Sequence, residues 1–180
     1  KIAVGMALED IAIANTNAAF EPSLDYVIAK LPRFPFDKFA TAPNTLGTQM
    51  KATGEVMGIG SNLEECFLKS IRSLEIGANH VYLSKFDSKS DDELTAYLDQ
   101  FKDDTIFCVA ELLRRGYSVE QLHDWTQITS YFLEAIVNII KMENRLKKAV
   151  KDEKVLLEAK KLGFSDVCIA RLWNCKEIEV

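Results

Sequence analysis

From residue 61 onward the chain carries a regular succession of helix start and stop signals, and these commit most of it to a helical fold. The first signal, Ser61-Asn62-Leu63-Glu64, is a capping box that predicts Ser61 as the N-cap of a helix over 61–75. Two further boxes begin at Ser90 and Ser118. Glycines that mark predicted helix ends stand at Gly77, Gly116 and Gly163.

The longest predicted helix covers residues 128–150 and carries a wide apolar stripe. The stripe consists of Ile128, Phe132, Ile136, Ile139, Ile140 and Met142. A stripe of this width indicates burial against several neighbouring elements rather than against one. We therefore expect this helix to be packed among the other helices of a bundle.

Before residue 60 the signals are those of β-strands. The segment 23–34 is rich in β-branched and aromatic residues that alternate between two faces. The predicted faces are Tyr26, Ile28 and Lys30 on one side and Val27, Ala29 and Leu31 on the other. The segment 54–60, GEVMGIG, predicts a second, short strand, which is apolar or glycine except for Glu55 near its start.

The change of pattern near residue 60 predicts a mainly α fold, a helical bundle preceded by a small α+β part. Residues 78–90, ANHVYLSKFDSKS, are polar and irregular and connect the two parts. We therefore expect a domain boundary somewhere within residues 76–90. His80 lies in the connector and is predicted to be solvated.

Composition limits the class of protein. The chain has 180 residues and is 48% hydrophobic, which suits a globular protein with a substantial core. A net charge of −5 argues against a nucleic-acid-binding surface, and no apolar run is long enough to predict a membrane span. Cys66, Cys108, Cys168 and Cys175 lack CxxC spacing, so we expect reduced, structural thiols in a cytoplasmic protein. Both ends of the sequence fall within apolar patterns, and we expect it to be part of a longer chain.

No pattern of catalytic residues stands out. His123 precedes Asp124, a pairing of general-base type, but adjacent residues of a helix do not face each other. The acid pairs at 91–92 and 103–104 are possible metal ligands, yet they stand where helix N-termini favour negative charge. No glycine-rich phosphate-binding loop is present. We therefore assign no catalytic, cofactor-binding or metal-binding residue.

The C-terminal stretch 157–180 leaves an alternative open. It predicts a helix, a glycine turn and a second helix, which is the outline of a helix-turn-helix DNA reader. The second helix presents mostly apolar residues, few of which suit the reading of base edges. A stand-alone helical module with a DNA-binding C-terminus is therefore the rival hypothesis to a packing unit.

Four stretches, in order along the chain, resemble the large chain of carbamoyl-phosphate synthase. They are FEPSLDYVIAKLPRFPFDKF at 20–39, LGTQMKATGEVMGIG at 46–60, SIRSLE at 70–75 and GFSD…IA at 163–170. The resemblance implies that residues 1–75 are the C-terminal tail of the first ATP-grasp synthetase half. It implies that residues 76–180 are the helical oligomerisation domain between the two halves. Two departures, the short loop at 9–20 and Ser61 in place of a common Arg, affect details of packing.

The resemblance also implies an activity for the parent enzyme. That enzyme makes carbamoyl phosphate from bicarbonate, ATP and glutamine-derived ammonia, for arginine or pyrimidine biosynthesis. The family's ATP- and metal-binding residues lie upstream of Lys1, so ATP and Mg or Mn are expected only in the full-length enzyme. This segment alone is predicted to be inactive.

Glu55 acquires an expected role from the same resemblance. In the family, carbamate passes between the two halves through a tunnel that is partly lined by glutamates, and Glu55 matches one such position. Met50 is a weaker candidate for the same wall. A carboxylate on a buried wall is costly unless water or donors solvate it, and a wet conduit would do so. The alternative is a glutamate at a strand end that faces bulk solvent.

The resemblance names partners as well. They are the other domains of the same large chain, the glutaminase small chain, and further copies of the large chain through the helical domain; neither nucleic acid nor membrane is expected. Self-association needs an exposed apolar patch. The predicted helix 91–101 offers one in the stripe of Leu94, Leu98 and Phe101, unless that stripe packs inside its own bundle.

Overall fold

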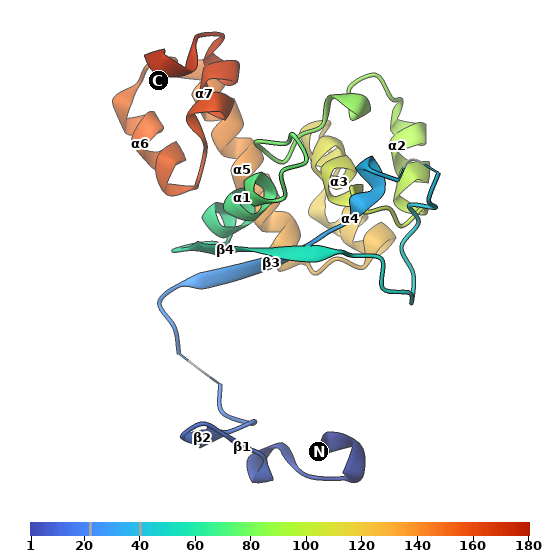
Figure 1. Cartoon of the computed structure of the whole chain (residues 1–180). Helices are drawn as coiled ribbons and strands as arrows, with labels where there is room; N and C mark the ends of the chain where they lie inside the picture. Colours follow the sequence, from blue (N-terminus) through green and yellow to red (C-terminus); the bar gives the residue numbers. More distant parts are fainter. Residues whose placement is uncertain (22, 40) are drawn as a thin grey trace.

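Two antiparallel strands, β3 (Val27–Arg33) and β4 (Gly54–Gly60), form a ribbon that is covered on one face by the helix α1 (Leu63–Ser73). The register runs from Val27 opposite Gly60 to Arg33 opposite Gly54. Figure 1 shows the ribbon lying along one side of the helical body. The computed structural model describes residues 1–21, 23–39 and 41–180, apart from the side chain of Asp37.

The two faces of the ribbon differ as the alternation predicts. Along β3, Val27, Ala29 and Leu31 are partly buried toward α1, whereas Ile28 and Lys30 are exposed on the outer face. Along β4 the buried positions are glycines. The prediction of two strands with these faces is therefore confirmed.

Glycines in β4 let α1 approach the backbone of the strand directly. A Cβ atom at Gly58 would lie 2.4 Å from the carbonyl oxygen of Cys66 and 2.3 Å from the hydroxyl oxygen of Ser70. The space is taken up by hydrogen bonds instead: the Cys66 thiol donates to the Gly58 carbonyl at 3.0 Å, and the Ser70 hydroxyl to the Ala29 carbonyl at 3.1 Å. The motif GEVMGIG thus forms a strand and also provides the close packing surface for α1.

The N-terminal cap of α1 differs by one residue from the predicted box. Asn62 is the cap, and its side-chain oxygen accepts from the backbone N–H of Glu65 at 2.8 Å. The carboxylate that reaches back belongs to Glu65, which accepts from the backbone N–H of Ser61. Asparagine caps helices as well as serine does, so the helix can begin at Leu63. Glu64 instead accepts a hydrogen bond from the Asn138 side chain at 2.8 Å.

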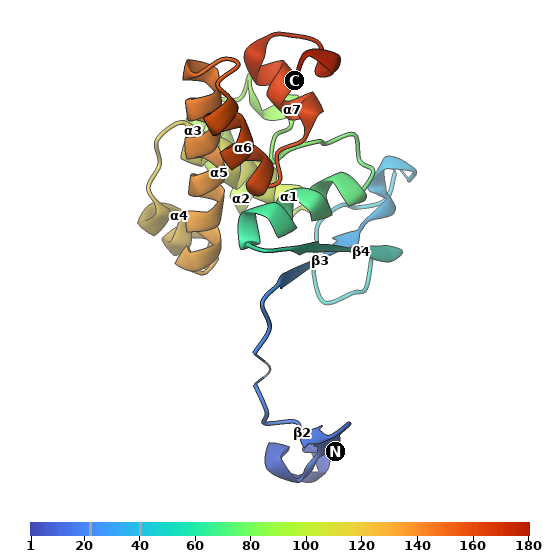
Figure 2. The same ribbon diagram turned by 90° about the vertical axis from the view of Figure 1, so that its left-hand side faces the viewer.

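Six more α-helices follow among the described residues, and the fold is mainly α with a small α+β part, as predicted. They are α2 (Asp91–Leu98), α3 (Thr105–Arg114), α4 (Val119–Thr126), α5 (Ser130–Lys148), α6 (Glu153–Lys161) and α7 (Asp166–Trp173). α5 contacts α1, α3, α4, α6 and α7, so the prediction that it is packed among several helices is correct. Figure 2 shows α6 and α7 beside the upper part of α5.

The turn between α6 and α7 is held against α1. Gly163 has a φ of +86°, a conformation that favours glycine, and a Cβ there would lie 2.8 Å from the Cα of Glu65. Arg72 of α1 donates to the Gly163 carbonyl at 2.7 Å, and Asn62 donates to the Lys161 carbonyl at 3.2 Å. The C-terminal helices and the ribbon are therefore both attached to the same short helix.

One cluster of buried side chains joins these elements. It includes Leu68 and Ile71 of α1, Leu112 of α3 and Ile139 of α5. The connector after α1 also belongs to it, because Ala78, Val81 and Phe86 are buried. The connector is thus part of the core, although its sequence is polar and irregular.

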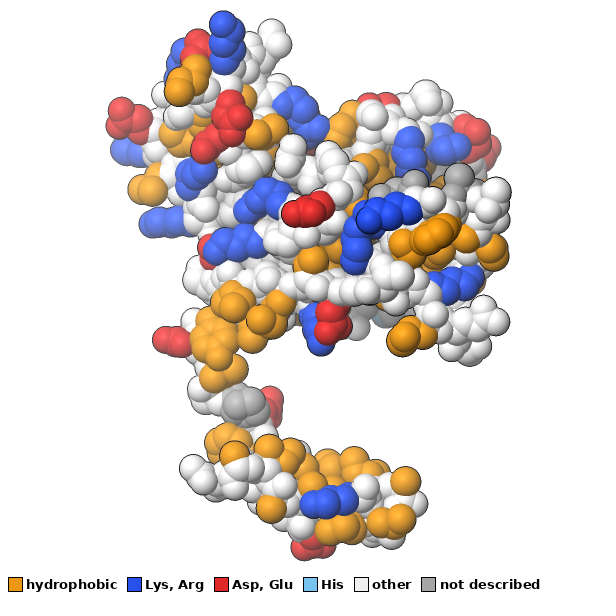
Figure 3. Space-filling view, in the orientation of Figure 1, with side chains coloured by type: hydrophobic (Ala, Val, Ile, Leu, Met, Phe, Trp, Pro, Cys, Tyr) orange, Lys and Arg blue, Asp and Glu red, His pale blue; other side chains and the backbone are white. Residues whose placement is uncertain are grey.

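The first twenty residues are arranged separately from the rest. β1 (Ala12–Ile13) pairs with β2 (Thr16–Asn17), next to the short 3-10 helices Ile2–Val4 and Leu8–Asp10. Figures 1 and 3 show this part at a distance from the helical body, with hydrophobic side chains on its surface. Across the described residues, no helix is both long enough and apolar enough to traverse a bilayer.

Replacing Gly58 with alanine should destabilise the protein by about 2 kcal/mol, because overpacking a close contact typically costs about 1–3 kcal/mol. The matched control is Gly54→Ala in the same strand, where a Cβ meets nothing within 4 Å. Urea unfolding followed by circular dichroism measures both. Equal stabilities for the two variants would show that the packing of α1 on β4 does not require a glycine at position 58.

Candidate functional site

Glu55 lies on the outer face of the ribbon, where its carboxylate pairs with the ammonium group of Lys30. The Lys30 Nζ atom is 2.8 Å from the Glu55 Oε1 atom. Lys30 is opposite Met57 in the register and Glu55 is opposite Pro32, so the pair runs diagonally across the strands. Both side chains are more than half exposed, and such a pair adds little to stability.

Apolar side chains surround this ion pair. Ile28, Met57 and Ile59 on the same face are exposed, as is Tyr26 just before β3. Figure 3 shows hydrophobic side chains gathered toward the start of β3. Exposed apolar surface of this kind is typical of a surface that packs against another protein element.

Met50 is not part of either strand of the ribbon. It lies in the loop before β4, and the residue is 93% exposed. Glu55 and Met50 are thus both accessible at the surface of the described protein. A role for either residue in the wall of a carbamate tunnel stays a prediction.

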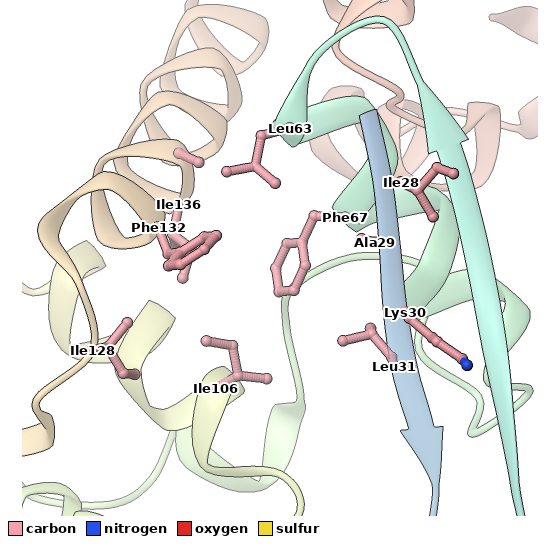
Figure 4. Close-up of a pocket in the computed structure, with 11 residues that line it drawn as sticks. Ile28, Ala29, Lys30, Leu31, Leu63, Phe67, Ile106, Ile128, Phe132 and Ile136 are labelled. Carbon is pink, nitrogen blue, oxygen red and sulfur yellow. The ribbon is translucent and has the colours of Figure 1, made fainter. Parts of the chain in front are cut away.

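An apolar cavity of about 360 Å³ opens on the β3 side of the ribbon. Residues 28–31 of β3 line it but no residue of β4 does, and in the described chain β3 pairs only with β4. Figure 4 shows Leu63 and Phe67 of α1 on one side and Ile128 and Phe132 on the other. Lys30 lines the cavity too, but its ammonium group is held by Glu55. The cavity therefore suits an apolar side chain better than a charged substrate.

The most polar site in the core is built around Glu143 of α5, which is only 3% exposed. Its Oε1 atom is 2.6 Å from Nε2 of His80 and 2.6 Å from an Nη atom of Arg114. The Arg114 Nε atom donates to Glu143 Oε2 at 3.0 Å, and the same guanidinium donates to the Val81 carbonyl. One buried carboxylate thereby joins α5, α3 and the connector.

The protonation states follow from these contacts. Burial raises the pKa of Glu143, but the hydrogen bonds from His80 and Arg114 and the charge of Arg114 outweigh it and hold the pKa at about 2. Burial lowers the pKa of His80, and the hydrogen bond to Glu143 opposes this only in part. Glu143 is therefore ionised and His80 neutral, with its proton on Nε2 where it donates to the carboxylate.

His80 was predicted to be solvated, and this was wrong, because its ring is 2% exposed and lies against Phe164 at a centroid distance of 4.9 Å. The signal that could have found the site is in α5. Glu143 stands in the apolar stripe, four residues after Ile139 and three before Leu146, both of which are fully buried. An acid in such a position needs a cationic or hydrogen-bonding partner.

Stability should fall as the pH is lowered from 8 to 5, because the unfolded chain binds a proton at His80 more readily than the folded protein does. Since burial lowers the folded pKa, the contribution is complete above the ordinary histidine value of 6.5 and declines below it. His80→Gln should flatten the profile in this window. Urea unfolding at several pH values measures the slope. An identical slope in wild type and His80→Gln would contradict the assignment.

Three other polar residues singled out in the sequence, His123, Asp91 and Asp104, have structural partners. His123 Nδ1 lies 2.8 Å from the Ile128 carbonyl. Asp91 pairs with Arg115 at 2.9 Å, and Asp104 accepts from the Tyr97 hydroxyl at 2.7 Å and contacts Lys85. Within the described residues no group of three or more metal-binding side chains is close enough to hold an ion.

The three residues predicted for self-association are placed differently from one another. Leu94 and Leu98 are buried in the core of the protein, at 0% and 5% exposure. Phe101 lies beyond the end of α2, with a φ of 48°, and is 67% exposed. Of the stripe, only Phe101 is available to a partner without rearrangement, and its role in self-association stays a prediction.

Residues 55–180 match the family model described as carbamoyl-phosphate synthetase large chain, oligomerisation domain. The chain belongs to this family. The match begins inside β4 and continues through every helix from α1 to α7, so it covers the shared core described above. The carbamoyl-phosphate synthase resemblance seen in the sequence is confirmed, whereas the domain boundary between residues 75 and 76 stays a prediction.

Membership of this family bears on the helix-turn-helix alternative. α6 and α7 lie inside the matched range, and α7 buries Cys168, Ile169, Ala170 and Trp173. The Trp173 indole donates to the Leu146 carbonyl of α5 at 3.0 Å. The pair of helices is thus bound into the oligomerisation domain, and the DNA-binding alternative has no support.

Proposed function

We propose that this chain acts as a non-catalytic scaffold and self-association module of a carbamoyl-phosphate synthase large chain. The observation that carries the proposal is the match of residues 55–180 to the oligomerisation domain of that large chain. The ribbon adds support, because its exposed apolar face and the cavity beside β3 are surfaces suited to further protein. The proposed partners of the chain are the other domains of the large chain, the glutaminase small chain and further copies of the large chain.

The activity of the parent enzyme belongs to the proposal as well. That enzyme makes carbamoyl phosphate from bicarbonate, ATP and glutamine-derived ammonia in the cytoplasm, for arginine or pyrimidine synthesis. ATP and Mg or Mn act in its ATP-grasp halves, for which residues 1–75 supply only the C-terminal tail. Residues 1–180 alone are therefore inactive.

Glu55 and Met50 are proposed to line the carbamate path of the assembled enzyme. The exposure of the Lys30–Glu55 pair supports this, because a carboxylate kept near water and an ammonium group carries little desolvation cost. An apolar surround also makes the Glu55 position suitable for a wall that is covered on assembly.

Self-association is expected to depend on Phe101. Phe101→Glu places a charge in the proposed contact and should weaken association at least tenfold, the loss expected when one buried aromatic anchor is removed. Leu157→Glu on α6 is the control, because Leu157 is similarly exposed (57%) and lies outside the stripe. Sedimentation velocity over a wide concentration range measures the mass, and circular dichroism checks the fold.

Two outcomes would contradict this account. One is a wild type that stays monomeric at every concentration, and the other is a Phe101→Glu variant that associates as strongly as the wild type. Leu94→Glu serves as a further comparison, because Leu94 is fully buried and its replacement should unfold the helical domain instead.

A further inference from the structure

Besides the apolar cavity beside β3, a polar cavity of about 220 Å³ lies between the connector and α7. Its walls include His80, Tyr82 and Ser84 from the connector and Cys168 and Arg171 from α7. Neither the scaffold role nor self-association uses this space. The polar lining of the cavity therefore has no role in the function proposed above.

His80, which lines this cavity, carries a buried ring nitrogen whose acceptor capacity is not satisfied. Its Nε2 proton is committed to the ionised carboxylate of Glu143, so Nδ1 carries a lone pair. Among the described residues, this buried nitrogen has no hydrogen-bond partner. A buried acceptor without a partner costs free energy, and a donor that entered the cavity would remove that cost.

Arg171 supplies a positive charge at the same cavity. Its guanidinium lies over the Tyr82 ring, with the Cζ atom 4.2 Å from the ring centroid. In the part of the chain that the structure describes, no carboxylate forms a salt bridge with it. A stacked guanidinium keeps its N–H edge available, in the geometry that suits carboxylates and phosphates.

We infer that this cavity binds a small oxyanion that retains a hydroxyl group, of which inorganic phosphate is an example. One anionic oxygen would accept from Arg171, and the hydroxyl would donate to Nδ1 of His80. An oxyanion without a proton, such as sulfate at neutral pH, offers only acceptors and would bring its lone pairs against that of Nδ1. The two groups together therefore select for a donor and an acceptor on one ligand.

Isothermal titration calorimetry of the intact chain at neutral pH tests the inference, with phosphate as the probe and sulfate at equal ionic strength as the comparison. We expect saturable binding of one phosphate per chain and sulfate binding at least tenfold weaker. Arg171→Gln should weaken phosphate binding at least tenfold, the usual effect of losing a charged hydrogen bond. Arg145→Gln, which removes the same charge from a surface pair with Glu158, should not.

The histidine is tested without a variant that might unfold the core. In nitrogen NMR, the Nδ1 resonance of His80 should move on addition of phosphate and stay in place on addition of sulfate. No saturable phosphate binding, equal binding of the two anions, or equal weakening by Arg171→Gln and Arg145→Gln would each overturn the inference. These results are independent of whether the chain self-associates.

Discussion

The direct contact of α1 with the backbone of β4 is the constraint on which the rest of the structure depends. Gly58 leaves room for Cys66 and Ser70, whose side chains bond to the ribbon. The opposite side of α1 carries Leu68 and Ile71 into the core of the helical domain. One helix of eleven residues therefore joins a strand pair to a bundle, and the two cannot be described as separate cores.

A second set of contacts fixes the helices around this junction. Glu143 holds the connector through His80 and α3 through Arg114, at a depth where an unpaired carboxylate would cost several kcal/mol. The turn at Gly163 lies against α1 and accepts from Arg72. A domain with these internal ties keeps its outer surfaces, such as the apolar face of the ribbon, in a fixed geometry for other domains or subunits, which suits a scaffold.

Much of the fold could be predicted from local patterns, because the periods of strands and helices are local properties. The strand faces and the burial of α5 followed from alternation and from a wide stripe. The helix cap at Asn62 was displaced by one residue, because Asn62 and Ser61 are equally able to cap. His80 was misplaced since polar composition reveals nothing of a partner sixty-three residues away. Leu94 and Leu98 show that a stripe indicates burial without telling which surface buries it.

Native-state hydrogen exchange tests most directly whether the ribbon, α1 and the bundle form one cooperative unit. Backbone amides of β4, α1 and α5 should open with the same free energy, close to that of global unfolding, while amides in residues 1–20 exchange much faster. Amides of β4 and α1 that exchange through a separate, lower-energy opening than those of α5 would contradict the account.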